Sequence, residues 1–151
     1  MSRYVLDTNI ILIYLKDVFT KKLIEDKFSP FSDDNVPIIS AVTIGELKSI
    51  AKQNNWGTKR IRAVQDLLDT FVVIGVRFED IFDAYAEIDA FSQGKLEHPR
   101  IKFSSRNMGK NDLWIAATAL VTDSMLLTTD KDFDHLDGEF IQVEYIERVQ
   151  K

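Results

Sequence analysis

Short apolar segments alternate with helical patterns along this chain, and that alternation limits the fold more than any other feature. Most of the apolar segments are runs of aliphatic and β-branched residues at successive positions, without regular polar interruptions. A strand of this composition is buried on both faces, which is typical of a parallel sheet covered by helices. We expect strands at 4–6, 37–42, 71–76, 125–129 and 140–146. The predicted fold is α/β, a three-layer α/β/α sandwich with a central parallel sheet.

The segments between these strands have the spacing of helices. Helices are expected at 10–15, 20–28, 43–53, from 58 onward, 79–91 and 112–121. Apolar side chains of the early helices are assigned to the core rather than to a partner surface: Ile11, Tyr14, Leu15, Phe19 and Phe28. Residues 93–110 form the longest expected loop, and loops of that length are often functional. A chain of 151 residues without a linker predicts one domain, residues 1–151.

The composition argues against several kinds of site and several classes of protein. The chain has no cysteine, which excludes a disulfide framework, a thiolate metal site and a cysteine nucleophile. The apolar N-terminus is interrupted by Asp7, and no stretch approaches the roughly 20 apolar residues of a membrane span. We therefore expect a cytoplasmic protein that does not contact the membrane. The net charge of −5 argues against a globally basic nucleic-acid binder.

Two local stretches are nevertheless basic. Residues 47–65 contain five Lys or Arg and no acid, and residues 95–110 contain five Lys or Arg against Glu97 alone. Such stretches could follow a phosphate backbone, or they could be ordinary solvated surface. The basic residues that we select as candidate contacts are Lys48, Lys52, Arg100, Lys102, Arg106 and Lys110.

Four acidic residues are expected at the same edge of the sheet. Asp7 and Asp130 follow expected strands, Glu46 lies in the first turn of an expected helix, and Asp112 opens the alanine-rich helix. Ligands bind open α/β sheets at the carboxyl ends of the strands, where these side chains would meet. Clustered carboxylates repel one another, so a cation is expected, and oxygen ligands suit Mg²⁺ or Mn²⁺. These ions support phosphoryl chemistry.

Each acid also has a structural interpretation. Glu46 could complete a capping box with Thr43. Asn111 or Asp112 could be a helix N-cap, and Asp130 could be a turn residue. Asp-Thr-Asn could be an Asx-type turn with Asp7 or Asn9 as N-cap. The metal-site hypothesis therefore depends on all four acids occurring together.

Four motifs resemble those of the PIN-domain ribonucleases, and especially the VapC-like toxins of toxin–antitoxin pairs. They are VLDTNI (5–10), ISAVTIGEL (39–47), NDLWIAATAL (111–120) and LLTTDKDFDHL (126–136), in the family's order and approximate spacing. Each motif is weak alone, but together they are specific and span nearly the whole chain. The resemblance implies the α/β/α sandwich and metal-dependent RNA cleavage that leaves 5′-phosphate and 3′-hydroxyl ends.

The resemblance also assigns roles to residues. It implies that the metal-binding and catalytic quartet is Asp7, Glu46, Asp112 and Asp130, with Mg²⁺ or Mn²⁺ as cofactor. The implied auxiliary residues are Thr8, Asn9, Thr128 and Asp132, the last as an addition to or substitute for Asp130. The implied partners are an RNA substrate, a cognate antitoxin and a second copy of the chain.

The segment 93–110 is longer than in many compact family members. It contains His98, Arg100, Lys102, Phe103 and Arg106, and it could be an RNA-contacting or partner-contacting flap or an ordinary insertion. We assign structural or surface roles to both histidines, His98 and His135.

Three other functions are weighed against the ribonuclease. A DNA nuclease would use the same metal chemistry. A phosphatase of the haloacid dehalogenase type needs an Asp-x-Asp motif, whereas the chain has Asp7-Thr8-Asn9. A non-catalytic PIN-like module for RNA binding or scaffolding would be expected to lack one of the four acids.

Overall fold

All five predicted strands occur, and they form one parallel sheet in the order β3-β2-β1-β4-β5. The computed structural model describes residues 1–96 and 105–150. The strands are β1 (Arg3–Leu6), β2 (Val36–Ser40), β3 (Val72–Ile74), β4 (Met125–Thr128) and β5 (Gln142–Tyr145). The last four are shorter than predicted, and β2 ends at Ser40 rather than at residue 42. β3 is an edge strand whose Val72 and Val73 are exposed, so its apolar sequence does not reflect burial on both faces.

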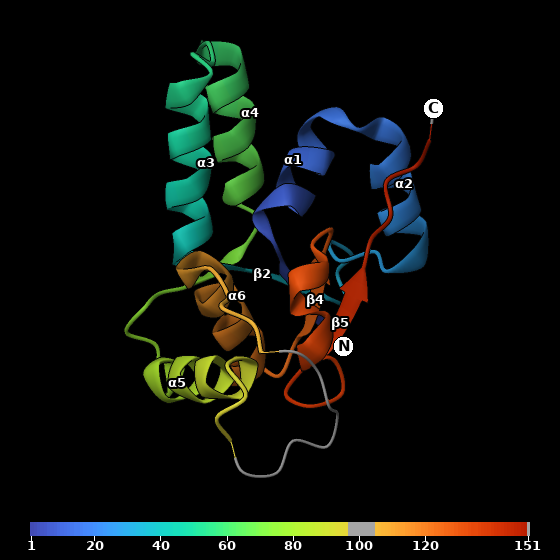
Figure 1. Cartoon of the computed structure of the whole chain (residues 1–151). Coiled ribbons are helices and arrows are strands. Elements are labelled where there is room, and N and C mark those ends of the chain that lie inside the picture. Colours follow the sequence, from blue (N-terminus) through green and yellow to red (C-terminus); the bar gives the residue numbers. More distant parts are fainter. Residues whose placement is uncertain (97–104, 151) are drawn as a thin grey trace.

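Helices cover both faces of this sheet, as Figure 1 shows. They are α1 (Thr8–Lys16), α2 (Val18–Lys27), α3 (Ala41–Gln53), α4 (Thr58–Leu68), α5 (Ile81–Ser92) and α6 (Lys110–Val121), with a 3₁₀ helix η1 (Lys131–Leu136) after β4. Successive side chains of β1 point to opposite faces, so Val5 packs into one core and Leu6 into the other. The predicted three-layer sandwich is confirmed.

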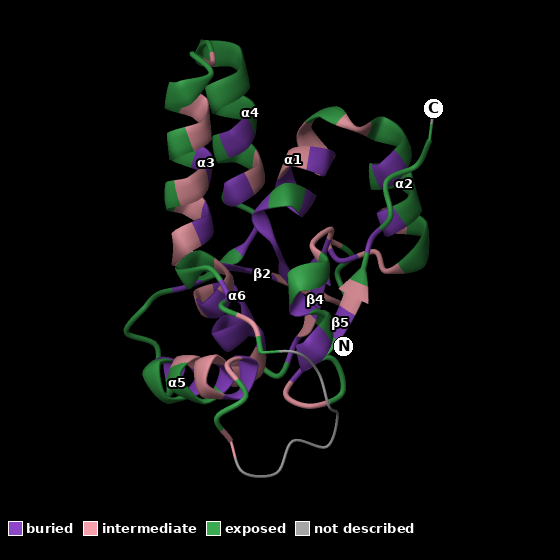
Figure 2. Cartoon of the chain, viewed as in Figure 1, coloured by how far each residue is buried: buried purple, intermediate pink, exposed green. Residues whose placement is uncertain are grey.

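Each of the two cores belongs to one helical layer. The core that contains Val5 includes Ile88 of α5 and Ile115 of α6, all with no exposed surface. The core that contains Leu6 includes Ile10 of α1 and Leu47 of α3. Figure 2 shows the buried residues along the sheet and on the inner sides of the helices. None of the helices in the described ranges is long and apolar enough to cross a membrane.

Most early apolar side chains are buried as predicted, with one exception. Ile11 is buried, and Tyr14, Leu15 and Phe28 pack partly buried against the core that contains Leu6. Phe19 is 57% exposed on α2, so its assignment to the core was wrong. Phe19 lies beside exposed Val18, on the side of α2 that faces solvent.

Four helices, α1, α2, α3 and α6, begin two residues earlier than predicted. The α3 helix begins at Ala41 after Ser40, whose Oγ accepts a hydrogen bond from the Val42 N–H at 3.3 Å. Thr43 is therefore inside the helix, and the capping-box interpretation of Glu46 is wrong. Glu46 lies in the second turn of α3, where the helix N-terminus supports its charge less than expected.

The order of strands changes direction beside β1. From β1 the chain adds β2 and then β3 on one side, and it later places β4 on the other side. The boundary between β1 and β4 is therefore a topological switch point, where the loops that leave neighbouring strands diverge. Asp7 directly follows β1, and Asp130 follows β4 by one intervening residue. The two acids that follow strands thus lie where this fold class places its ligands.

Candidate metal centre

Asp7 is the buried acid at the centre of the carboxyl edge. It is the N-cap of α1, where its Oδ1 accepts a hydrogen bond from the Thr8 N–H at 2.7 Å. Its Oδ2 accepts a hydrogen bond from Thr128 Oγ1 at 2.7 Å, and its own N–H donates to the Leu127 carbonyl at 3.0 Å. The Asx-cap interpretation of Asp7 is thus confirmed, and it is compatible with a role in the site.

Burial raises the pKa of Asp7 above its usual value of 3.8. The hydrogen bonds from Thr128 and Thr8 act in the opposite direction, while the negative charges of Glu46 and Asp130 raise the pKa further. A buried carboxylate surrounded by others is costly to ionise unless positive charge compensates it. The surroundings of Asp7 therefore favour a bound cation.

Glu46 reaches the same edge from α3 through a threonine. Thr8 Oγ1 donates a hydrogen bond to Glu46 Oε1 at 2.7 Å and also lies 3.3 Å from Thr43 Oγ1. Thr8 and Thr43 are both buried. Because Thr8 directly follows Asp7, this bond couples the position of Glu46 to the end of β1.

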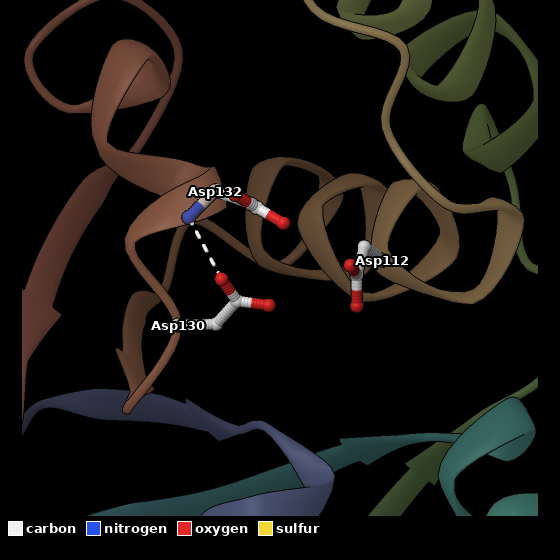
Figure 3. A group of neighbouring side chains, drawn as sticks. All are labelled: Asp112, Asp130 and Asp132. Atoms are coloured by element: carbon white, nitrogen blue, oxygen red, sulfur yellow. Dashed lines mark hydrogen bonds between the residues drawn. The ribbon is translucent and has the colours of Figure 1, made fainter.

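Asp112, Asp130 and Asp132 form a tighter group beside Asp7. One carboxylate oxygen from each of the three lies within 4.8 Å of the others. Figure 3 shows Asp112 on α6 and the other two on the chain after β4, all facing a common space. Asp130 caps η1, with its Oδ1 accepting from the Asp132 N–H at 2.8 Å, and the Asp130 N–H donates to Thr128 Oγ1 at 3.0 Å.

The pKa of Asp112 depends on the charges of all the other acids in the cluster. Burial, followed by the charges of Asp7, Asp130, Glu46 and Asp132 in that order, raises the pKa of Asp112 from 3.8 to about 7. Asp112 is the third residue of α6, which begins at Lys110 after Gly109. The prediction that Asp112 opens this helix, and its alternative interpretation as the N-cap, are both wrong.

The residues present fit a divalent cation. Five carboxylates converge, and within residues 1–96 and 105–150 none of them forms an ion pair with Lys or Arg. A set of oxygen donors without sulfur suits Mg²⁺ or Mn²⁺. Asp112, Asp130 and Asp132 are placed to share one ion, and Asp7 and Glu46 are near enough to add negative charge.

The other predicted residues occupy several different positions. Thr128 links Asp7 to the Asp130 backbone, whereas Asn9 is exposed on α1. Lys48 and Lys52 are exposed on α3. At about 100° per residue they project roughly 160° and 120° away from Glu46 around the helix. Lys110 is exposed at the start of α6, and Arg106 is half-buried against η1. The predictions for His98, Arg100, Lys102 and Phe103 lie outside the described residues.

A family model for the PIN domain matches residues 4–139. The chain belongs to the PIN-domain family. Two curated relatives of this PIN domain are the proteins named ribonuclease VapC1 from Haemophilus influenzae strains R2866 and Rd. They are 31% and 30% identical to it over 134 residues, which is 88% of this chain and 91% of each relative.

Solved structures agree with the observed architecture. VapBC-1 from nontypeable Haemophilus influenzae matches this PIN domain with a TM-score of 0.71 and 28% identity, covering 95% of this chain and 97% of that one. VapBC2 from Rickettsia felis, determined with a DNA fragment from its promoter, matches with a TM-score of 0.67 over 96% and 99%. Its identity of 18% supports the fold alone.

Proposed function

We propose that this PIN domain is a metal-dependent endoribonuclease and the toxin of a toxin–antitoxin pair. The observation that carries the proposal is the convergence of Asp7, Glu46, Asp112, Asp130 and Asp132 at one edge of the sheet. Relatives at 30–31% identity are named ribonucleases, and the similar structure at 28% identity is a VapBC complex. These likenesses favour RNA over DNA as the substrate.

The proposed cofactor is Mg²⁺ or Mn²⁺, held by Asp112, Asp130 and Asp132 with Asp7 beside them. A bound ion of this kind lowers the pKa of water and offsets the charge that develops on a phosphodiester. The protein contributes a fixed arrangement of its own groups. Thr128 orients Asp7 and the Asp130 backbone, while Thr8 orients Glu46. Preorganised groups of this kind need little rearrangement during the reaction.

A hollow beside Glu46 is the proposed place for part of the RNA. Its volume is about 500 Å³, and its polar lining includes Glu46, Ser49, Gln53 and Asn111. Serine, glutamine and asparagine side chains can bond to sugar or base edges without a fixed charge. The exposed Lys110 remains a candidate RNA contact outside the acidic centre. Lys48 and Lys52 remain candidates only for RNA that extends around α3, because they project away from Glu46.

The proposed protein partners are a cognate antitoxin and a second copy of the chain. Exposed apolar side chains on α2, namely Val18, Phe19 and Leu23, offer one surface for such contacts. A second is a hollow of about 820 Å³ between α1 and the α3–α4 pair, where Leu12 and Trp56 contribute to the lining. The cytoplasm is the proposed location.

The deciding experiment compares wild type with Asp7→Asn on total RNA, each with Mg²⁺, with Mn²⁺ and with a chelator. Asparagine keeps an oxygen that can accept the Thr8 N–H, so the variant removes charge with little change to the helix cap. Asp66→Asn is the matched control, because Asp66 is exposed on α4. We expect discrete fragments from wild type and the control, none from Asp7→Asn, and none in chelator.

The same assay separates the alternatives. Near-complete metal-dependent cleavage by Asp7→Asn would refute the assignment of the site. Equal cleavage of matched DNA and RNA oligonucleotides would identify a general nuclease. Mn²⁺ binding with no turnover of RNA or DNA would favour the non-catalytic module.

A further inference from the structure

Three residues outside the acidic cluster join the two segments that supply it. Ser92 ends α5, Arg106 lies in the segment that leads to Asp112, and His135 lies on η1, which follows Asp130 and contains Asp132. Ser92 has no exposed surface, His135 is 5% exposed, and Arg106 is half-buried. Ser92 and His135 carry side chains of potentially reactive types, but neither residue belongs to the carboxylate site.

Hydrogen-bond contacts link the side chains of Arg106, His135 and Ser92. Arg106 Nη1 lies 3.3 Å from His135 Nδ1, and His135 Nε2 lies 2.6 Å from Ser92 Oγ. The two ring nitrogens of His135 therefore link Arg106 on one side to Ser92 on the other. Ser92 Oγ then donates to Met108 Sδ at 3.2 Å.

Packing and electrostatics both act on the His135 ring. Burial, and after it the nearby charge of Arg106, lower the pKa of His135 to about 4, against the effect of a hydrogen bond with the Asp132 backbone. The ring also stacks on Phe91, with ring planes 4° apart and centroids 6.2 Å apart. The imidazole is therefore held in one orientation by packing as well as by hydrogen bonds.

Arg106 also contacts the backbone that carries the acids. Its Nη1 lies 3.3 Å from the Lys131 carbonyl and 3.4 Å from the Asp132 carbonyl, and its own N–H donates to the Ser92 carbonyl at 2.6 Å. Arg106 thus bridges the end of α5 to the first turn of η1. The sequence pattern suggested that Arg106 contacts RNA, whereas in the fold its Nη1 faces protein acceptors.

We propose that Ser92, Arg106 and His135 are positioning residues that hold Asp130 and Asp132 opposite Asp112. The three carboxylates repel one another, so without a bound cation the η1 segment would tend to move away from α6. The latch formed by Ser92, Arg106 and His135 opposes that movement. It thereby keeps three oxygens within 4.8 Å and ready to share one ion. This inference rests on the proposed metal-dependent function.

The test is calorimetric binding of Mn²⁺ alone to purified full-length protein, without RNA. The variants are Arg106→Met, which keeps the alkyl chain, and His135→Phe, which keeps an aromatic ring on Phe91. Residues that orient metal ligands typically alter affinity by about 10- to 100-fold, so we expect at least about tenfold weaker binding in each variant. The double variant should lose little more than either single one, because the two residues act as a unit.

The sign of the Arg106→Met effect separates positioning from simple electrostatics. Removing a positive charge near a cation site should strengthen Mn²⁺ binding by Coulomb's law, whereas loss of positioning weakens it. Arg148→Met is the matched control, because Arg148 is 47% exposed and lies 3.8 Å from Asp17, on another part of the chain. We expect the control to bind Mn²⁺ like wild type.

Ser92→Ala provides a smaller perturbation if His135→Phe folds poorly. We expect it to weaken Mn²⁺ binding in the same direction, measured at a temperature where circular dichroism shows the folded state. If wild type binds Mn²⁺ and the variants bind it equally well, the latch is wrong and the proposed function stands. A higher KM for RNA in Arg106→Met alone, with unchanged Mn²⁺ affinity, would also overturn the latch. If wild type binds neither Mn²⁺ nor Mg²⁺, both proposals fail.

Discussion

Replacing Asp112 by asparagine should stabilise the metal-free protein while removing its ability to hold a cation. The folded chain keeps a proton on Asp112 up to a pH of about 7, whereas an unfolded chain releases it near 3.8. Between these values the folded state binds more protons, so the free energy of unfolding falls as pH rises. Because asparagine does not ionise, the free energy of unfolding of the variant does not fall in this way. The difference in stability between the variant and wild type should therefore widen with pH.

The size of the effect follows from the pKa of Asp112. Each pH unit in that window is worth at most about 1.4 kcal/mol, so the ceiling between about pH 5 and about pH 7 is roughly 3 kcal/mol. Asp112 is partly exposed, and solvent and neighbouring groups relax around its charge. We therefore expect about half of the ceiling, on the order of 1.5 kcal/mol. The difference should become constant about one pH unit above the pKa of Asp112, where the carboxyl is fully ionised in both states.

Urea unfolding in chelator across this pH range measures the effect directly, because a change in midpoint at constant slope reports stability. Asp66→Asn removes the same charge from an exposed position on α4, and its effect should stay within about 0.5 kcal/mol at every pH. Adding Mn²⁺ at about 100 times its dissociation constant should stabilise wild type by about 2.7 kcal/mol and the Asp112 variant much less. A difference that stays flat or narrows from about pH 5 to about pH 7 would refute the raised pKa of Asp112 in the folded protein.

Three further predictions test other parts of the site and the fold. Thr128→Val removes the hydrogen bond to Asp7 and the acceptor for the Asp130 N–H. We expect a loss of about 1–3 kcal/mol in the free energy of urea unfolding and weaker Mn²⁺ binding, and Thr128→Ser should restore both. Equal behaviour of the two variants would contradict this role. Phe133→Ala should cost about 3–5 kcal/mol in the same assay because Phe133 has no exposed surface; a loss below about 1 kcal/mol would show that η1 is not anchored by this ring. Lys48→Gln combined with Lys52→Gln should reduce the salt dependence of RNA affinity by about one logarithmic slope unit per lost phosphate contact, while Mn²⁺ affinity is unchanged. An unchanged salt slope would show that the RNA does not contact the face of α3 that carries these two lysines.

Several properties of this protein follow from local sequence. Apolar residues at successive positions predicted parallel strands buried on both faces, and the central strands β1, β2 and β4 agree. Asp7 and Asp130 could be placed because an acid just after such a strand lies at its carboxyl end in any order of strands. Their caps on α1 and η1 are also short-range interactions, which the adjacent residues specify.

Only the tertiary structure decided how the acids meet. The order of strands puts β4 beside β1, so Thr128 can bond to Asp7 across 121 positions of sequence. Glu46 lies a turn farther along its helix than predicted, and its link to Thr8 depends on how α3 packs against α1. Asp132 joins Asp112 and Asp130 because η1 folds back over the edge of the sheet.

The contacts among Ser92, Arg106 and His135 likewise could not be predicted from local sequence. Ser92 and His135 are 43 positions apart, and no periodicity or short motif connects them. A basic residue in a predicted loop is expected to be exposed to solvent or to a ligand, whereas Arg106 donates hydrogen bonds to backbone carbonyls. Local patterns specify which segments become strands and helices because those choices depend on neighbouring residues. Which side chains share a buried site depends on the packing of distant segments, and the folded chain alone determines that.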